Sequence, residues 1–327
     1  MELVALFTVL VKILVVLLLI PVVVGFCTLA ERKILGRIQV RYGPNRAGPF
    51  GLLQWMADAV KLISKEYLIP EQADKAVFVI APVLTLVPAV TVFALIPFGK
   101  GLQITDVNVG LLMLVAISSL GIFGVIFGGW ASNSKYSLLG AMRSAAQMIS
   151  YELAMGLSLV AVVMMAGTMR MTGIVEAQQG LWFLVAQPLG FIVFFIAGIA
   201  ETNRLPFDMP EAEGDLGAGY HTEYSAMGFG LFQLGEYASI ITICALITTF
   251  FLGGWSGPWA DALMGLPSLV YFVLKTAFFV FVFIWIRGTL PRVRPDQLMA
   301  FGWKILLPAA LLNILFVAVI VSLGVVK

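Results

Sequence analysis

Eight long apolar runs divide this 327-residue chain, and they constrain its fold more than any other feature of the sequence. A helix needs about twenty apolar residues to cross the hydrocarbon of a bilayer. The runs cover roughly residues 3–29, 77–98, 109–130, 146–168, 182–200, 229–252, 267–289 and 303–325. With 61% hydrophobic residues, the chain has too little polar surface to cover a soluble globule. The sequence therefore predicts an all-α integral membrane protein with eight transmembrane helices, forming one polytopic membrane domain over residues 1–327.

The cysteines and the histidine offer no pattern for a metal or redox centre. Cys27 and Cys244 lie separately in apolar runs, and His221 is the single histidine. Zinc and iron–sulfur sites need clustered thiolates or imidazoles, and a bis-histidine haem needs a second histidine. We expect no metal site and no redox centre within the chain, and we interpret His221 as a surface or interface residue.

Lysine and arginine are distributed unevenly between the two ends of the predicted spans. Eight spans place both termini on one side, called side A, and Lys100, Arg170 and Lys327 fall in its segments. Fifteen others fall on the opposite side B, eight of them between Arg32 and Lys75. Positively charged loops stay in the cytoplasm. The termini are therefore expected on the outer side of a bacterial cytoplasmic membrane, with the mitochondrial inner membrane as the alternative.

The first long loop on side B, residues 30–75, contains an amphipathic segment. The turn-rich stretch RYGPNRAGPFG, flanked by Arg41 and Arg46, precedes it. Its apolar stripe is formed by Leu52, Leu53, Met56, Val60, Leu62 and Ile63, and its polar stripe by Asp58, Lys61 and Lys65. The segment is too short and too charged to span a membrane, so we expect a helix lying in the interface. An ordinary solvated loop helix is the alternative.

The second long loop on side B, residues 201–228, is rich in acids. Six of the eighteen carboxylates of the chain lie between Glu201 and Ser225, with Arg204 as the one arginine among them. We expect Asp208 to cap a short helix that begins near Pro210. Carboxylates at this density cannot all be ionised when packed under partner subunits, so they titrate as coupled sites. That behaviour suits a proton entry or a redox-sensitive switch, and a solvated acidic run is the alternative.

Two glutamates and a lysine fall inside apolar runs, where an unpaired charge is costly. Glu152 lies about two turns inside the fourth run, and Glu236 lies at a similar depth in the sixth. Burial favours the protonated form of a carboxylate, which allows proton uptake and release near neutral pH. The alternative is a structural acid bonded to Lys275, Arg143 or a tyrosine hydroxyl. We expect Lys275 to be the charge partner of one of the two acids.

Five motifs occur in order along the chain: ERKILGRIQVRYGPNR, AD..KL..KE, NSKYSLLGAMRSAAQMISYE, ETNRLPFDMPEAEGDL..GYHTEYS and LPRVRPDQLMAFGWK. Together they resemble the quinone-site membrane subunit of respiratory complex I, the NADH:quinone oxidoreductase, called the H subunit in bacteria and subunit 1 in mitochondria. The resemblance extends from the first span to the last. Subunits of membrane-bound hydrogenases and of ferredoxin- or coenzyme F420-dependent dehydrogenases share part of the pattern, so the electron donor is less certain than the ancestry.

The resemblance implies a subunit that works only within a larger complex. Quinone is then the substrate, while FMN and iron–sulfur clusters belong only to partner subunits. The expected partners are the hydrophilic quinone-site subunits with the terminal iron–sulfur cluster, the other membrane-arm subunits and the lipid bilayer. The chain would form the membrane half of a quinone tunnel and the start of a route for proton pumping.

Positions that match the motifs have expected roles. The implied proton path consists of Glu152, Glu201, Glu211, Glu213, Asp215, Glu223 and Glu236, with glutamate more usual in the family at the position of Asp215. The implied polar part of the quinone tunnel consists of Glu31, Arg32, Arg41, Asp58, Arg204 and Asp208. We expect Phe26, Trp55, Met56 and Phe232 at the apolar mouth of the tunnel, and plain packing is their alternative role.

Two hypotheses from other classes remain open at this point. In a stand-alone ion-coupled transporter, Glu152, Glu236 and Lys275 would form an ion site near the middle of the membrane. The lack of an internal repeat and the large charged loops on side B argue against this class. The other hypothesis is a structural anchor that contributes no chemistry.

Overall fold

The computed structural model of the chain describes residues 2–209, 217–256 and 268–323, with side chains from Phe7 onward. Within these ranges the chain is helical and contains no strand. Seven helical stretches are long and apolar enough to cross a membrane. The predicted all-α integral membrane fold is confirmed.

The order of the elements follows the apolar runs of the sequence. They are α1 (Glu2–Ile38), η1 (Pro49–Gly51), α2 (Gln54–Ser64), α3 (Lys75–Thr91), η2 (Val92–Ala94), α4 (Gly110–Ser119), α5 (Gly121–Ala131), α6 (Lys135–Ala166), α7 (Met171–Glu176), α8 (Phe183–Ala186), α9 (Pro188–Glu201), η3 (Gly219–His221), α11 (Ala226–Phe251), α12 (Ser268–Thr289), α13 (Pro295–Phe301), the π-helical turn η4 (Gly302–Leu306) and α14 (Leu307–Ser322). Three spans combine successive elements: α3 with η2, α4 with α5, and α13 with η4 and α14.

The predicted span at residues 182–200 is not one continuous helix. Helix α8 ends at Ala186, Gln187 is non-helical with φ −137° and ψ 68°, and α9 begins at Pro188. Proline has no backbone N–H and restricts the residue before it, so the helix restarts there. Seven of the eight predicted runs therefore correspond to span-length helices in the described structure. The remaining run, residues 182–200, corresponds to α8 and the 14-residue α9.

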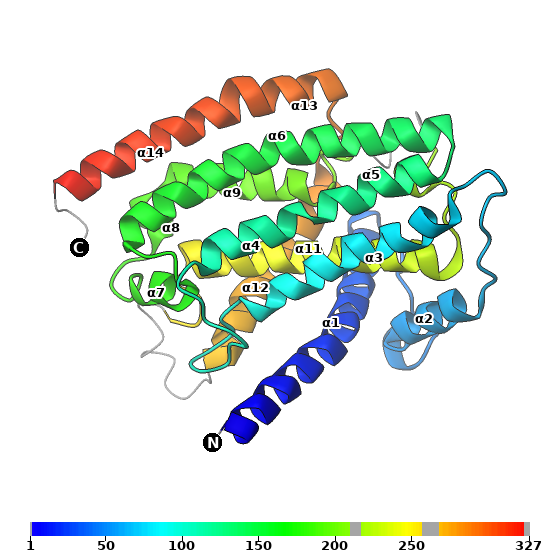
Figure 1. Cartoon of the computed structure of the whole chain (residues 1–327), viewed down its shortest axis with the longest axis horizontal. Coiled ribbons are helices and arrows are strands. Elements are labelled where there is room, and N and C mark those ends of the chain that lie inside the picture. The colour runs from blue at the N-terminus through cyan, green and yellow to red at the C-terminus, as the bar shows by residue number, and fades with distance from the viewer. Residues whose placement is uncertain (1, 210–216, 257–267, 324–327) are drawn as a thin grey trace.

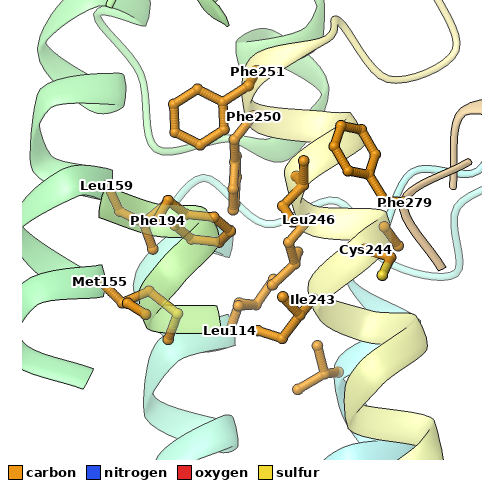
Figure 2. Packing of buried hydrophobic residues seen from close by; sticks show 14 of the residues in the cluster. Leu114, Met155, Leu159, Phe194, Ile243, Cys244, Leu246, Phe250, Phe251 and Phe279 are labelled. Carbon is orange, nitrogen blue, oxygen red and sulfur yellow. The ribbon is translucent and has the colours of Figure 1, made fainter. Parts of the chain in front are cut away.

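The main core surrounds α11. In its most apolar stretch 78% of the residues are buried, against 11% for α1, so α11 is central and α1 peripheral. Phe194 of α9 packs on Phe250 and Phe251 of α11, with ring centroids 6.0 Å and 5.5 Å away. Leu114 from α4 and Met155 from α6 point toward the same centre (Figure 2). This close-packed apolar region holds the helices in fixed relative positions.

A second core joins α3, α5 and η3 to the beginning of α11. Phe78 stacks on Tyr224 with centroids 4.0 Å apart, and the Tyr224 hydroxyl donates a hydrogen bond to the Phe78 carbonyl. Burial raises the pKa of the Tyr224 phenol, which keeps the hydroxyl protonated as a donor. Phe232 completes the cluster, edge-on to Tyr224 at 4.8 Å.

The connecting segments gather at opposite ends of the bundle (Figure 1). The A end contains residues 92–109, 167–182 and 252–256, beside α7. The B end contains residues 39–74, 132–134, 202–209 and 217–225, including α2 and η3. These two ends correspond to sides A and B of the predicted topology.

Candidate functional site

Helix α1 places two neighbouring charges at the B end. The helix continues past the predicted end of the first span to Ile38, so Glu31 and Arg32 lie on helical turns. Successive residues of an α-helix point about 100° apart. Glu31 faces the bundle and is 6% exposed, whereas the Arg32 side chain is half exposed.

A chain of buried ion pairs begins at Glu31. Its Oε1 accepts hydrogen bonds from Nη1 of Arg287 and, at 3.5 Å, from Nη1 of Arg204. Arg204 Nε lies 2.5 Å from Glu236 Oε1, and its guanidinium lies over the Tyr237 ring at 4.4 Å. We call Arg287, Glu31, Arg204 and Glu236 the charge chain. It connects α12, α1, the segment after α9, and α11.

Burial makes each member of the charge chain dependent on the others. The side chains of Glu31 and Arg204 are 8% exposed and that of Glu236 is 12% exposed. A buried charge that loses its partner is strongly destabilised, and hydrogen bonds between charged groups are the strong ones in proteins. A proton gained by either acid therefore changes the interactions of the neighbouring arginines.

The contact region between α1 and α2 brings together four predicted tunnel residues. Arg32 Nη1 donates to Asp58 Oδ2 of α2 at 2.6 Å. Phe26 packs on Trp55, with ring centroids 5.6 Å apart. Trp55 comes this close because residue 25 is glycine: a Cβ at Gly25 would lie 2.9 Å from the indole. Polar and aromatic groups thus lie together where α1 meets α2.

The other predicted tunnel residues do not join this contact region. Met56 is on an exposed face of α2, and Arg41 donates to Gln39 in the exposed loop after α1. Phe232 is 1% exposed inside the second core, packed on Tyr224. Its ring also packs edge-on against Tyr220 of η3, and its expected place at the tunnel mouth stays a prediction.

A second pair of acids lies between α6 and α9. Glu201 is the last residue of α9 and is 8% exposed. Glu152 of α6 accepts a hydrogen bond from the Ser119 hydroxyl of α4. The two carboxylates are close enough for their charges to interact. The structure therefore groups two of the predicted proton-path acids.

Glu201 lines an internal cavity of about 70 Å³. Polar lining residues are Thr85, Ser118, Ser239 and Thr242, and apolar ones include Leu114, Met155, Leu159, Phe194 and Leu246, shown in Figure 2. Glu201 Oε2 and Thr242 Oγ1 are buried and have no hydrogen-bond partner among the described residues. The lining is mostly apolar, but with these polar groups on its wall a cavity of this volume has room for a few water molecules.

Lys275 is held at the A end by backbone carbonyls. Its ammonium donates to Leu252, Gly254 and Ser256 at 2.6 Å, 3.0 Å and 2.9 Å, and lies 4.2 Å from the centroid of the Tyr271 ring. The predicted pairing of Lys275 with Glu152 or Glu236 is wrong. Arg204 reaches Glu236 first, and the Ser119 hydroxyl reaches Glu152.

The acidic loop is described only in part. Glu211, Glu213 and Asp215 lie outside the described residues, as does the helix start predicted near Pro210. Asp208 and Glu223 are half-buried at the B end. Arg204, the one arginine of this loop, pairs with Glu31 and Glu236 in the described structure.

Sequence reasoning missed Arg287 as a member of the site. In the sequence it counted only as one of fifteen basic residues on side B. Its position in the last turn of α12, where the apolar run ends, was the available signal, since a charge there needs a partner.

Comparison with known proteins gives one consistent family. The sequence model of the NADH dehydrogenase family matches residues 11–318. The chain is 55% identical over 313 residues to H subunit 1 of the NADH-quinone oxidoreductase of Geobacter metallireducens and to H subunit 2 of that of Geobacter sulfurreducens, covering 93% of each chain. The H subunit of Rhodospirillum centenum is 50% identical over 304 residues, covering 92% of this chain and 90% of its own. The chain therefore belongs to the H-subunit family of NADH-quinone oxidoreductases, the complex I membrane subunits, and the transporter hypothesis falls away.

Proposed function

We propose that this chain forms the membrane half of the quinone tunnel and the first part of the proton route in a proton-translocating NADH-quinone oxidoreductase. The observation that supports this most directly is the charge chain, in which Arg204 joins Glu31 of α1 to Glu236 of α11 inside the bundle. Buried carboxylates beside arginines can gain and lose protons in response to a nearby reaction.

The side chains where α1 contacts α2 suit the mixed chemistry of a quinone. Phe26 and Trp55 offer apolar contact to a ring and its tail, while Arg32 and Asp58 offer polar groups to the carbonyls. Quinone reduction takes up electrons and protons. The electrons would come from the terminal iron–sulfur cluster of hydrophilic partner subunits, which also hold FMN, and this chain's acids would relay protons.

The second pair of acids extends the route into the bundle. Glu201 lines the internal cavity, and Glu152 contacts Ser119 on the neighbouring α4. In this proposal the acidic-loop residues Glu211, Glu213, Asp215 and Glu223 connect quinone reduction to these acids. Fifteen lysines and arginines on side B against three on side A support a cytoplasmic B end and outer termini in a bacterial membrane.

The decisive experiment neutralises one acid at a time in the assembled complex. Glu236→Gln and Glu201→Gln are each expected to lower quinone-linked turnover and proton pumping by about a hundredfold, the usual contribution of a positioned proton-transfer group. NADH oxidation by a soluble acceptor that bypasses quinone should be unchanged. Turnover and pumping are measured in vesicles containing the complex.

Glu71→Gln is the matched control, because Glu71 is an exposed acid of the B end. Normal quinone reduction and pumping in both buried variants would refute the proposal and leave a structural anchor. The double variant Glu211→Gln with Glu213→Gln applies the same test to the acidic loop.

A further inference from the structure

Gln147 of α6 makes two hydrogen bonds to one short segment at the B end. Its side chain is fully buried, and Nε2 donates to the carbonyls of Ala200 and Phe207, each at 2.7 Å. A primary amide has two N–H donors, so each has an acceptor here. Gln147 therefore fastens both ends of residues 201–206 to α6.

This segment contains Glu201 from the second pair of acids and Arg204 from the charge chain. Glu201 lines the internal cavity, and Arg204 joins Glu31 to Glu236 in the charge chain. Between them, Asn203 has φ 50°, a left-handed conformation that turns the backbone directly after α9. Because Glu201 and Arg204 share so short a stretch of backbone, a shift of the segment moves both side chains together.

Two other contacts each hold the segment at a single residue. The Pro206 carbonyl accepts from the backbone N–H of Val293, and the Asn203 amide lies 3.6 Å from the Met148 sulfur. Each of these fixes one point. Gln147 spans the segment from one end to the other with a single planar amide, so it also sets the distance between those ends.

We propose that Gln147 is a positioning residue of the coupling site, which sets the placement of Glu201 relative to Arg204. The inference rests on the proposed function, because the placement affects turnover only if protons move through these acids. Among the described residues, the charged and titratable groups facing the segment are Glu152 from α6, Cys27 and Glu31 from α1, Glu236 and Tyr237 from α11, and Arg287 from α12. A loosened segment changes the interactions of Glu201 and Arg204 with all of them.

The test compares three variants in the complete complex. Gln147→Met keeps the size of the side chain and removes both donors. Gln147→Glu keeps one donor when protonated and repels both carbonyls when ionised. The matched control is Gln178→Met, because Gln178 is equally buried and its Nε2 also donates to two carbonyls, of Ile174 and Thr249, but at the A end.

The readout is quinone-linked turnover divided by NADH oxidation with a soluble acceptor. Both rates are measured at about six pH values from pH 5.5 to 9, the range over which acids with a pKa near neutrality titrate. Gln147→Met is expected to shift the half-maximal pH by about one unit, the size that loss of a buried hydrogen bond gives. Gln147→Glu should lose turnover more steeply than wild type as pH rises. Gln178→Met should keep the wild-type profile.

Three results would overturn the inference. One is a wild-type pH profile in assembled Gln147 variants. Another is an equal shift in Gln178→Met, which would indicate general loosening. The third is failure of both Gln147 variants to assemble while Gln178→Met assembles, which would indicate a role in folding. Full turnover in Glu201→Gln and Glu236→Gln would instead refute the proposed function itself.

Discussion

The two ends of the bundle stabilise buried charge in different ways. At the B end, Glu31, Arg204 and Glu236 pair with one another through side chains. At the A end, Lys275 donates to three backbone carbonyls, and Lys12 donates to those of Gly101 and Gln103. Backbone carbonyls do not titrate in the physiological range, whereas carboxylates do. The comparison teaches that the partners of the B-end charges can themselves gain a proton, whereas the carbonyl partners of Lys275 and Lys12 cannot.

The largest effect is expected from removing the cation shared by two acids. Arg204→Met leaves Glu31 and Glu236 without a common partner, which should cost about 3–5 kcal/mol of stability. Assembly of the complex should fall sharply, as measured by the yield of intact complex and its thermal unfolding temperature. Arg41→Met, in the exposed loop after α1, is the control. Normal assembly and turnover in Arg204→Met would remove the contrast between the two ends.

A smaller effect is expected at the A end. Lys275→Met leaves the carbonyls of Leu252, Gly254 and Ser256 without this donor, so stability should fall by about 1–3 kcal/mol. Quinone turnover per assembled complex should stay at the wild-type value, because no proton-path acid contacts Lys275 in the described structure. A loss of turnover comparable to that of Glu236→Gln would show that the A end also takes part in coupling.

The smallest effect on stability is expected in the contact region between α1 and α2. Arg32→Gln breaks a partly exposed pair with Asp58 and should cost less than about 1 kcal/mol. Salt screens such a pair, so the difference in unfolding temperature from wild type should shrink as ionic strength rises. Under the proposed function the KM for quinone rises more than kcat falls. A stability loss as large as that of Arg204→Met would place Arg32 among the buried charges.

The fold was predictable to the extent that it depends on local hydropathy. Seven apolar runs became span-length helices, because length and composition alone decide whether a helix can cross a membrane. The run at 182–200 broke at Pro188, a signal already present in the sequence that hydropathy does not register. The short helix α2 also formed within the amphipathic segment that periodicity indicated.

The site was predictable in its residue types and much less in its contacts. The sequence placed Glu152, Glu201 and Glu236 near hydrocarbon, and motif resemblance grouped them into one function. Sequence reasoning assigned Lys275 to the wrong partners, because the depth of a residue within a span does not reveal which face of the helix it occupies. Phe232 raises the same question, because an aromatic residue on a span packs a core or lines an opening according to its direction, and here its ring packs on Tyr220 and Tyr224.

The sequence by itself determined that this chain is a membrane subunit of the NADH-quinone oxidoreductase family, with its basic residues concentrated on one side. Those properties follow from composition, run length and motif order, which are all local. Only the tertiary structure decided that Arg204 serves Glu31 and Glu236, that Arg287 completes the charge chain, and that Lys275 is held by carbonyls. Glu31 and Arg204 lie 173 positions apart, and the packing of α1 and the segment after α9 around α11 is what brings them together.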